Sequence, residues 1–394
     1  MSSNTYTVEA VLKADASGFT GSINNARSAF ENFTKGTESK LSKVGDSLGK
    51  IGSTLNKRVT VPVATGLGAS VKIFQSFDDA MRKVAATSGI AADSSSKSYV
   101  EMRKQAEQLG ASTRYSASEV AEGMNYMAMA GWSAEQTMAG IPAVLDLAAA
   151  SGENLGTTSD IVTDAMTAFG MQAEQAGEFA DILAAASSNA NTNVSMMGDT
   201  FKYVAPVAGS LGFNAKDTAI AIGLMANSGI KGSQAGTALR AGLVNLVHPS
   251  EAAQKAMDSL GISVTDSEGN MKSFRTIMGD LREKMGGLSE TQKASAAATI
   301  FGKEAMSGWL AIINSSDGDF NKLANAIDNS QGATKRMVDT MEGGIGGSFR
   351  NLRSAIEGLG IAIGDRLAPY VKKGAEYITQ LTNKLTNLSP EMQD

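Results

Sequence analysis

Residues 227–240 read NSGIKGSQAGTALR, with three glycines, one lysine and several hydroxyl side chains close together. Such a stretch either wraps a phosphate or forms the turn between two helices. A phosphate-binding loop places its lysine and hydroxyl after the last glycine, between a strand and a helix. Here Lys231 precedes Gly232, no lysine follows Gly236, and the preceding AIAIGLMA is typical of a helical unit. We therefore interpret the stretch as a turn between helices.

Turns of this kind recur through the middle of the chain, over about residues 100–245. GWSAEQ (131–136), GMQAEQ (170–175) and GFNAKD (212–217) share the order glycine, apolar, polar, alanine, charged, polar, and they start 39 and 42 residues apart. We expect each glycine to end one helix and the polar residue two places on to cap the next. A period of about 40 residues with two helices per unit is typical of stacked helical hairpins.

Different patterns flank this middle region. Residues 5–13, TYTVEAVLK, alternate apolar and polar side chains, which predicts a short β-strand. Further on, apolar residues at steps of three and four predict long helices that bury a stripe against a partner helix. The predicted helix–helix contact residues are Phe19, Ile23, Phe30, Leu41, Val44, Leu48, Ile51 and Leu55 near the N-terminus and Phe349, Leu352, Ile356, Leu359, Ile378, Leu381, Leu385 and Leu388 near the C-terminus. The partner is either the body of the same chain or another chain.

The predicted fold is mainly α, with a helical core of stacked helix pairs, long amphipathic flanking helices and one short N-terminal β-strand. We expect three regions. Residues 1–63 hold the strand and a long amphipathic helix, which ends where Pro62 cannot continue it. Residues 64–342 form the helical core. Residues 343–394 form a C-terminal helical arm after the glycine-rich hinge GGIGG (343–347).

Three local patterns in the last third of the chain carry expectations of their own. DSEGN (266–270) predicts a turn, and TIFGKEAMSGWLAI (299–312) predicts one helix with Trp309 inside it. Pro369 is expected to kink or cap the segment that joins the last two apolar blocks.

Composition argues against several classes of function. The chain of 394 residues has a formal net charge of −5, whereas a nucleic-acid-binding protein usually has a basic face. It has no cysteine, which excludes disulfides and thiolate metal sites. Its one histidine, His248, is expected at a helix end. No apolar run approaches the ~20 residues of a membrane span. We predict no catalytic, cofactor-binding or metal-binding residue, and no cofactor.

Enzymes that cleave polysaccharides are harder to exclude, because they need only two carboxyl groups and the chain has 40. GLMA (223–226) faintly resembles a stretch of lytic transglycosylases, but the likeness stops at four residues. We therefore expect Leu224 and Met225 in the core. An enzyme that degrades peptidoglycan stays open as the alternative function, and a membrane-perturbing helical effector as a third.

Six phrases, in the right order, resemble the core region of phage tail tape measure proteins. They are FDDAMRKVAATSG (77–89), LGASTRYSASEVAEGM (109–124), AMAGWSAEQ (128–136), FKYVAPVAGSLG (201–212), GIKGSQAGTALR (229–240) and IFGKEA (300–305). The later stretch LGIAIGDRLAPYVKKGAEYITQL (359–381) is similar to the family as well. In this family the stretch that contains Lys231 is not a catalytic motif.

The resemblance implies a virion structural protein that sets tail length, templates the tail tube and is ejected during infection. The implied partners are copies of itself, with a trimer as one state, the tail tube protein, tail assembly chaperones and distal tail or tail-tip proteins. Specific nucleic-acid binding is not implied. The implied location is the virion, inside the tail tube, after synthesis in the host cytoplasm. Because relatives are usually much longer, we expect either the N-terminal part of a longer protein or an unusually short version.

Overall fold

The computed structural model describes residues 61–386, with side chains over residues 68–380. The described part contains helices and no sheet; its one isolated antiparallel bridge joins Thr265 to Met271 around the predicted turn DSEGN. The predicted mainly α fold is confirmed. The predicted N-terminal strand and the eight N-terminal contact residues lie outside the described part.

The helices follow one another with short connections. They are α3 (Val61–Ser88), α4 (Lys97–Ser112), α5 (Ala117–Met129), α6 (Ala134–Ser151), α7 (Leu155–Ala168), α8 (Ala176–Asn189), α9 (Val194–Ser210), α10 (Ala215–Asn227), α11 (Gly232–Val247), α12 (Glu251–Leu260), α13 (Phe274–Gly286), α14 (Glu290–Phe301), α15 (Met306–Ile313), α16 (Asp317–Asp328), α17 (Ala333–Glu342) and α18 (Ile345–Thr386), with a short 3-10 turn, η2 (Ala173–Gln175), before α8.

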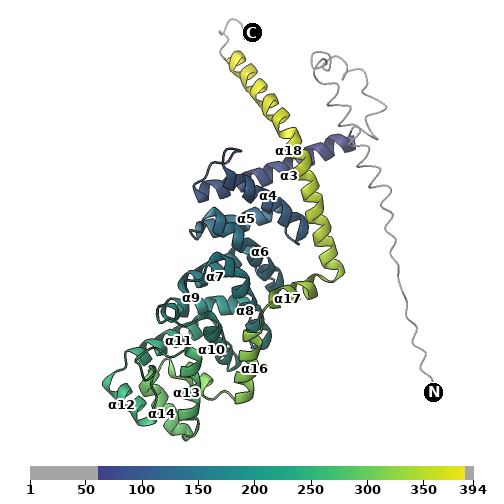
Figure 1. Cartoon of the computed structure of the whole chain (residues 1–394). Coiled ribbons are helices and arrows are strands. Elements are labelled where there is room, and N and C mark those ends of the chain that lie inside the picture. The colour runs from purple at the N-terminus through teal and green to yellow at the C-terminus, as the bar shows by residue number, and fades with distance from the viewer. Residues whose placement is uncertain (1–60, 387–394) are drawn as a thin grey trace, which may run out of the picture. The chain divides into compact units, whose positions relative to one another are not determined.

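Successive helices alternate between two layers. In one layer α5, α7, α9 and α11 pack on one another in that order, and in the other α4, α6, α8 and α10 do the same (Figure 1). This packing lies within the compact unit that begins at Ile73. The predicted stacked helix pairs are therefore confirmed.

The chain reverses direction at the end of this stack. Helices α14 and α15 pack on α11, and α13 and α15 pack on α10. From there α16 packs on α10 and α8, α17 packs on α8 and α6, and α18 packs on α4 and α5 (Figure 1). The last three helices thus run back along the second layer, toward the helices with which the unit begins.

The three repeated turns share one backbone geometry. Gly131, Gly170 and Gly212 have φ values of 87°, 66° and 77°, in the left-handed region that glycine adopts without strain. In each turn the N–H of the next residue donates to the carbonyl five positions back, which is the Schellman ending of a helix. These pairs are Trp132 with Met127, Met171 with Met166, and Phe213 with Ala208.

The polar position of the motif caps the following helix in two of the three turns. The Ser133 side chain accepts a hydrogen bond from the Gln136 N–H at the start of α6, and Asn214 accepts one from the Asp217 N–H at the start of α10. In the third turn the residue is Gln172, which precedes η2 instead of capping an α-helix directly. Side-chain capping thus satisfies backbone donors that the helix itself leaves free.

The stretch 227–240 forms the turn from α10 to α11, as predicted. Gly229 has a φ of 85° and ends α10, and Gly232 has a φ of 58° at the start of α11. Gly236 has a different role, because a Cβ atom there would lie 2.7 Å from the Thr200 carbonyl oxygen of α9. Its glycine therefore lets α11 lie close against α9.

A second close approach seats the largest core side chain. Trp309 is fully buried, stacks on Phe301 with 4.5 Å between ring centroids and donates its indole N–H to the Ala238 carbonyl at 3.0 Å. A Cβ atom at Gly242 would lie 1.8 Å from that indole nitrogen. The small residue on α11 thus provides the space that the tryptophan fills.

One predicted helix in this part of the chain differs from the structure. The predicted helix over 299–312 is two helices, because Gly302 takes a φ of 87° between the end of α14 and the start of α15. Of the two roles expected for Pro369, a cap does not apply, because it lies inside α18, and a kink stays a prediction. An interior proline destabilises a helix by about 3 kcal/mol, yet α18 continues through Pro369 to Thr386. Pro62 lies in the first turn of α3, where its missing N–H is harmless.

Candidate functional site

Five of the eight predicted C-terminal contact residues have described side chains, and these lie on an exposed face of α18. Their exposed fractions are 64% for Phe349, 52% for Leu352, 48% for Ile356, 46% for Leu359 and 64% for Ile378. Ile345 and Ile363 extend the same stripe and are exposed as well. Leu381, Leu385 and Leu388 lie beyond the residues whose side chains are described. We call the exposed apolar face of α18 from Ile345 to Ile363 the seam.

The opposite face of α18 is the one that contacts the chain's own core. Ser354 and Ile361 are buried there, and the Ser354 hydroxyl donates to the Arg114 carbonyl at 3.2 Å. Gly360 lies beside the seam, one turn after Ile356, and a Cβ atom there would lie 2.8 Å from the Ile73 side chain of α3. The seam residues themselves stay exposed among the described residues.

The glycine-rich segment before α18 is shorter than its sequence suggests. Helix α17 ends at Glu342 and α18 begins at Ile345, so only Gly343 and Gly344 lie between them. Gly346 and Gly347 belong to the first turn of α18. The division of the chain into the three predicted regions stays a prediction.

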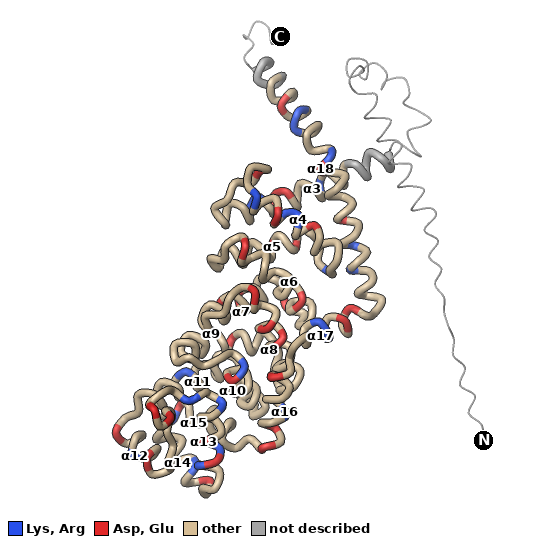
Figure 2. The backbone as a smooth tube through the Cα atoms, viewed as in Figure 1, with Lys and Arg blue, Asp and Glu red and all other residues tan. Residues whose placement is uncertain are grey.

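Charge is unevenly distributed over the stack. From Tyr115 to Phe201 the sequence has no lysine or arginine. All the charged residues of α5 to α8 are therefore Asp or Glu (Figure 2). A nucleic-acid-binding face needs clustered basic side chains. These four helices therefore provide no such cluster of their own.

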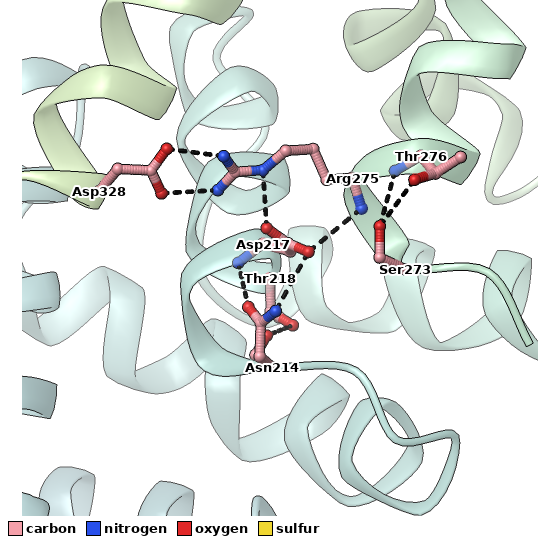
Figure 3. A network of polar contacts seen from close by, with 7 residues as sticks. All are labelled: Asn214, Asp217, Thr218, Ser273, Arg275, Thr276 and Asp328. Carbon is pink, nitrogen blue, oxygen red and sulfur yellow. Dashed lines mark hydrogen bonds and ion pairs between the residues drawn. The ribbon is translucent and has the colours of Figure 1, made fainter.

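One polar cluster joins three helices through Arg275, at the start of α13 (Figure 3). Its Nε donates to the Asp217 carboxylate at 2.8 Å, and its two terminal nitrogens donate to Asp328 at 2.6 and 2.8 Å. The Asp217 side chain is only 6% exposed and also accepts from the Asn214 amide at 3.2 Å. The hydrogen bond from Arg275 lowers the pKa of Asp328. Because the guanidinium and both carboxylates satisfy one another, the cluster ties helices together and offers no free reactive group.

Other residues singled out in the sequence also have structural positions. Leu224 and Met225 are buried, as predicted. His248 directly follows α11, and its N–H donates to the Val244 carbonyl, so it lies at a helix end as predicted. Lys231 precedes α11 and makes no side-chain capping hydrogen bond. Among the described residues, no cluster of three metal-ligating side chains is present, and no helix is long and apolar enough to cross a membrane.

Comparison with known proteins places this fold in a family. A family model described as Phage-related minor tail protein matches residues 103–302, which is half of the chain. This chain belongs to the phage-related minor tail proteins. The matched residues run from within α4 to just past the end of α14, and so include the repeated turns and the stretch 227–240.

Two curated relatives of this tail protein are tape measure proteins. The tape measure protein of Pneumococcus phage Dp-1 is 36% identical over 383 residues, which are 97% of this chain and 33% of that protein. The probable tape measure protein of Escherichia phage P2 is 30% identical over 328 residues, 82% of this chain and 40% of that protein. These matches confirm the resemblance to tape measure proteins. The chain spans between a third and two fifths of the length of these relatives, and no solved structure matches it.

Sequence patterns missed the polar contacts that hold α17 and α18 of this tail protein on the stack. The residues that make them are far apart in the chain: Glu342 pairs with Arg114, and Asp181 accepts from the backbone of Gly332. No local spacing joins such residues. Only a three-dimensional arrangement brings them together.

Proposed function

We propose that this chain is part of a tape measure protein, a phage tail protein that sets tail length by its own length. In this role it templates assembly of the tail tube, lies inside the tube and is ejected during infection. The observation that carries the proposal is the similarity to a tape measure protein over 97% of the chain. A mainly helical chain suits a measuring role, because a helix has a fixed rise of about 1.5 Å per residue.

A change in tail length tests the proposal. Duplicating α18 in the phage gene that encodes this segment adds 42 residues, which is a whole number of heptads and so keeps the phase of an a/d stripe. If the added residues lie as a helix along the tail axis, we expect tails longer by roughly 60 Å. Electron microscopy of purified virions measures this difference.

A phage with synonymous codon changes over the same region is the matched control, because it carries altered DNA and an unaltered protein. We expect its tails to keep the parental length. Intact virions with the duplication and tails of unchanged length would contradict the measuring role.

The proposed partners are further copies of this chain, with a trimer as one state, together with the tail tube protein, tail assembly chaperones and distal tail or tail-tip proteins. Self-association has the most direct support, because the seam consists of apolar residues at heptad spacing that the chain's own described core leaves exposed. Residues at such spacing bury one another when helices pair.

Lysine at the centre of the seam is expected to weaken self-association. Ile356→Lys places a charge where an apolar side chain would be buried, which costs about 2 kcal/mol per helix and raises the dissociation constant more than tenfold. Asn351→Lys is the control, since Asn351 is exposed on α18 but lies outside the seam. Sedimentation equilibrium of the full chain and both variants gives the dissociation constants. Equal values for the two variants, or a native chain that stays monomeric at high concentration, would argue against the seam as the contact.

A further inference from the structure

Helices α17 and α18 differ from the rest of the compact unit in how they are held. We call them the strap (Ala333–Thr386); they run back over α8, α6, α5 and α4 (Figure 1). Among the described side chains of the strap, Ile361 is the only buried hydrophobic one. By contrast, helix α10 alone buries Ile220, Ile222, Leu224 and Met225. Apolar burial therefore contributes little to holding the strap.

A carboxylate of the stack holds the start of α17. The two oxygens of Asp181, on α8, accept hydrogen bonds from the Gly332 N–H at 2.7 Å and the Thr334 N–H at 2.9 Å. These N–H groups lie at the N-terminus of α17, where the helix has no acceptor of its own and where the helix dipole favours a negative charge. Asp181 is thus both the cap of α17 and its tether to the stack.

A second carboxylate holds the junction between the two strap helices. Glu342, the last residue of α17, accepts from the Arg114 guanidinium at 2.9 Å and pairs with Arg350 of α18 at 2.8 Å. Its side chain is only 11% exposed. Since Arg114 lies just before α5, this pair ties the α17–α18 junction to the beginning of the stack.

A third carboxylate holds the middle of α18. Glu357 accepts a hydrogen bond from the Ser118 N–H at 3.1 Å, in the first turn of α5. The arrangement mirrors that at Asp181: there the stack supplies the carboxylate and the strap supplies the helix N-terminus, and here the roles are exchanged. Charged hydrogen bonds therefore fix the strap to the stack at three places along its length, and α18 is also held by the Ser354 hydroxyl on the Arg114 carbonyl and by an ion pair between Asp365 and Arg103 of α4 at 3.6 Å.

We propose that the strap detaches from the stack as one unit while α4 to α16 stay folded. Detachment breaks the carboxylate contacts of Asp181, Glu342 and Glu357 described above, which we call the clamps. Elements with few buried apolar contacts open at a lower free energy than the core. Detachment needs no helix to unfold, because α17 and α18 keep their own backbone hydrogen bonds and the loop Asn329–Gly332 lies outside both α16 and α17. Once free, α18 exposes its packed face as well as the seam.

Hydrogen exchange of the full chain, read by mass spectrometry, tests this proposal. Once detached, α17 and α18 lose their packing and open readily as isolated helices, so in the native sequence we expect their amides to exchange together and at least tenfold faster than those of α9 and α11. Glu342→Gln removes the charge from one clamp, and we expect it to accelerate exchange in α17 and α18 by a further factor on the order of ten, with α9 and α11 unchanged. The control is Glu251→Gln, because Glu251 pairs only with its neighbour Lys255 on α12 and is 85% exposed.

A measurement on the native chain keeps the test decisive if a clamp variant does not fold. Salt screens charged contacts, so raising the salt concentration to ~1 M is expected to accelerate exchange in the strap several-fold and to leave α9 and α11 unaffected. Two results would overturn the proposal: strap amides that exchange as slowly as those of α9 and α11, or strap exchange that responds neither to salt nor to Glu342→Gln.

Discussion

Replacing Gly209 with alanine is expected to destabilise the stack by about 3 kcal/mol, at the upper end of the usual effect of overpacking a core. Gly209 lies in α9, and a Cβ atom there would lie 2.0 Å from the Ala168 carbonyl oxygen at the end of α7. A flexible side chain moves aside at little cost. Here the obstacle is backbone, so relieving the clash means moving one helix away from the other along their shared contact.

Urea denaturation of the full chain measures this effect, and another helical glycine supplies the control. Gly279 lies inside α13, and nothing lies within 4 Å of the place where its Cβ would be. Gly279→Ala is therefore expected to stabilise the protein by about 0.5–1 kcal/mol, since alanine is the better helix former. If both variants shift the urea midpoint in the same direction, the close approach of α7 and α9 is not what Gly209 provides.

The two kinds of glycine in this chain differ in how far sequence reveals them. Gly131, Gly170 and Gly212 recur in one motif with a polar cap two positions later, so their role as helix endings was predictable from spacing and composition. Gly209 and Gly242 lie inside helices, and nothing beside them in the sequence marks what they face. Their role depends on an atom of another helix, and only packing shows which atom that is.

The same distinction explains which predictions of the fold and of the candidate site succeeded. Stacked hairpins were predictable because they result from local endings and caps repeated about every 40 residues. The apolar stripe on α18 was equally visible, but its spacing is the same for a contact within the chain and a contact between chains. The choice depends on the other face of the helix, where Ser354 and Ile361 are buried against the chain's own core. That face lacks a continuous apolar pattern, so sequence did not identify it.

Removing the guanidinium of Arg275 is expected to destabilise the protein by about 3 kcal/mol, the lower end of the cost of breaking a buried ion pair. In Arg275→Met the Asp217 carboxylate, only 6% exposed, keeps the Asn214 amide but loses its charged partner. Arg275 is itself one-third exposed, so water reaches the vacated space and moderates the cost. The variant also loses the bidentate contact that joins α13 to Asp328 of α16.

A second substitution separates the cost of the unpaired charge from the loss of side-chain packing. Asp217→Asn in the Arg275→Met background removes the buried negative charge, and we expect it to restore at least ~1.5 kcal/mol, because an uncompensated buried charge accounts for most of such a penalty. Urea denaturation at pH 7 gives the three free energies of unfolding. A double variant no more stable than Arg275→Met would mean that the guanidinium acts by packing alone.

The dependence of stability on pH gives an independent measure of the same cluster. Arg275 lowers the pKa of Asp328 from its ordinary value of 3.8, so Asp328 binds a proton less readily in the folded state than in the unfolded state. Its contribution to stability is therefore fully present above the unfolded pKa and is lost as the pH falls through the folded pKa. In Arg275→Met this contribution is absent at every pH, so the difference in free energy of unfolding between native chain and variant should shrink as the pH falls below about 4. A difference that stays constant across that range would show that the pairing of Arg275 with Asp328 does not stabilise the contact between α13 and α16.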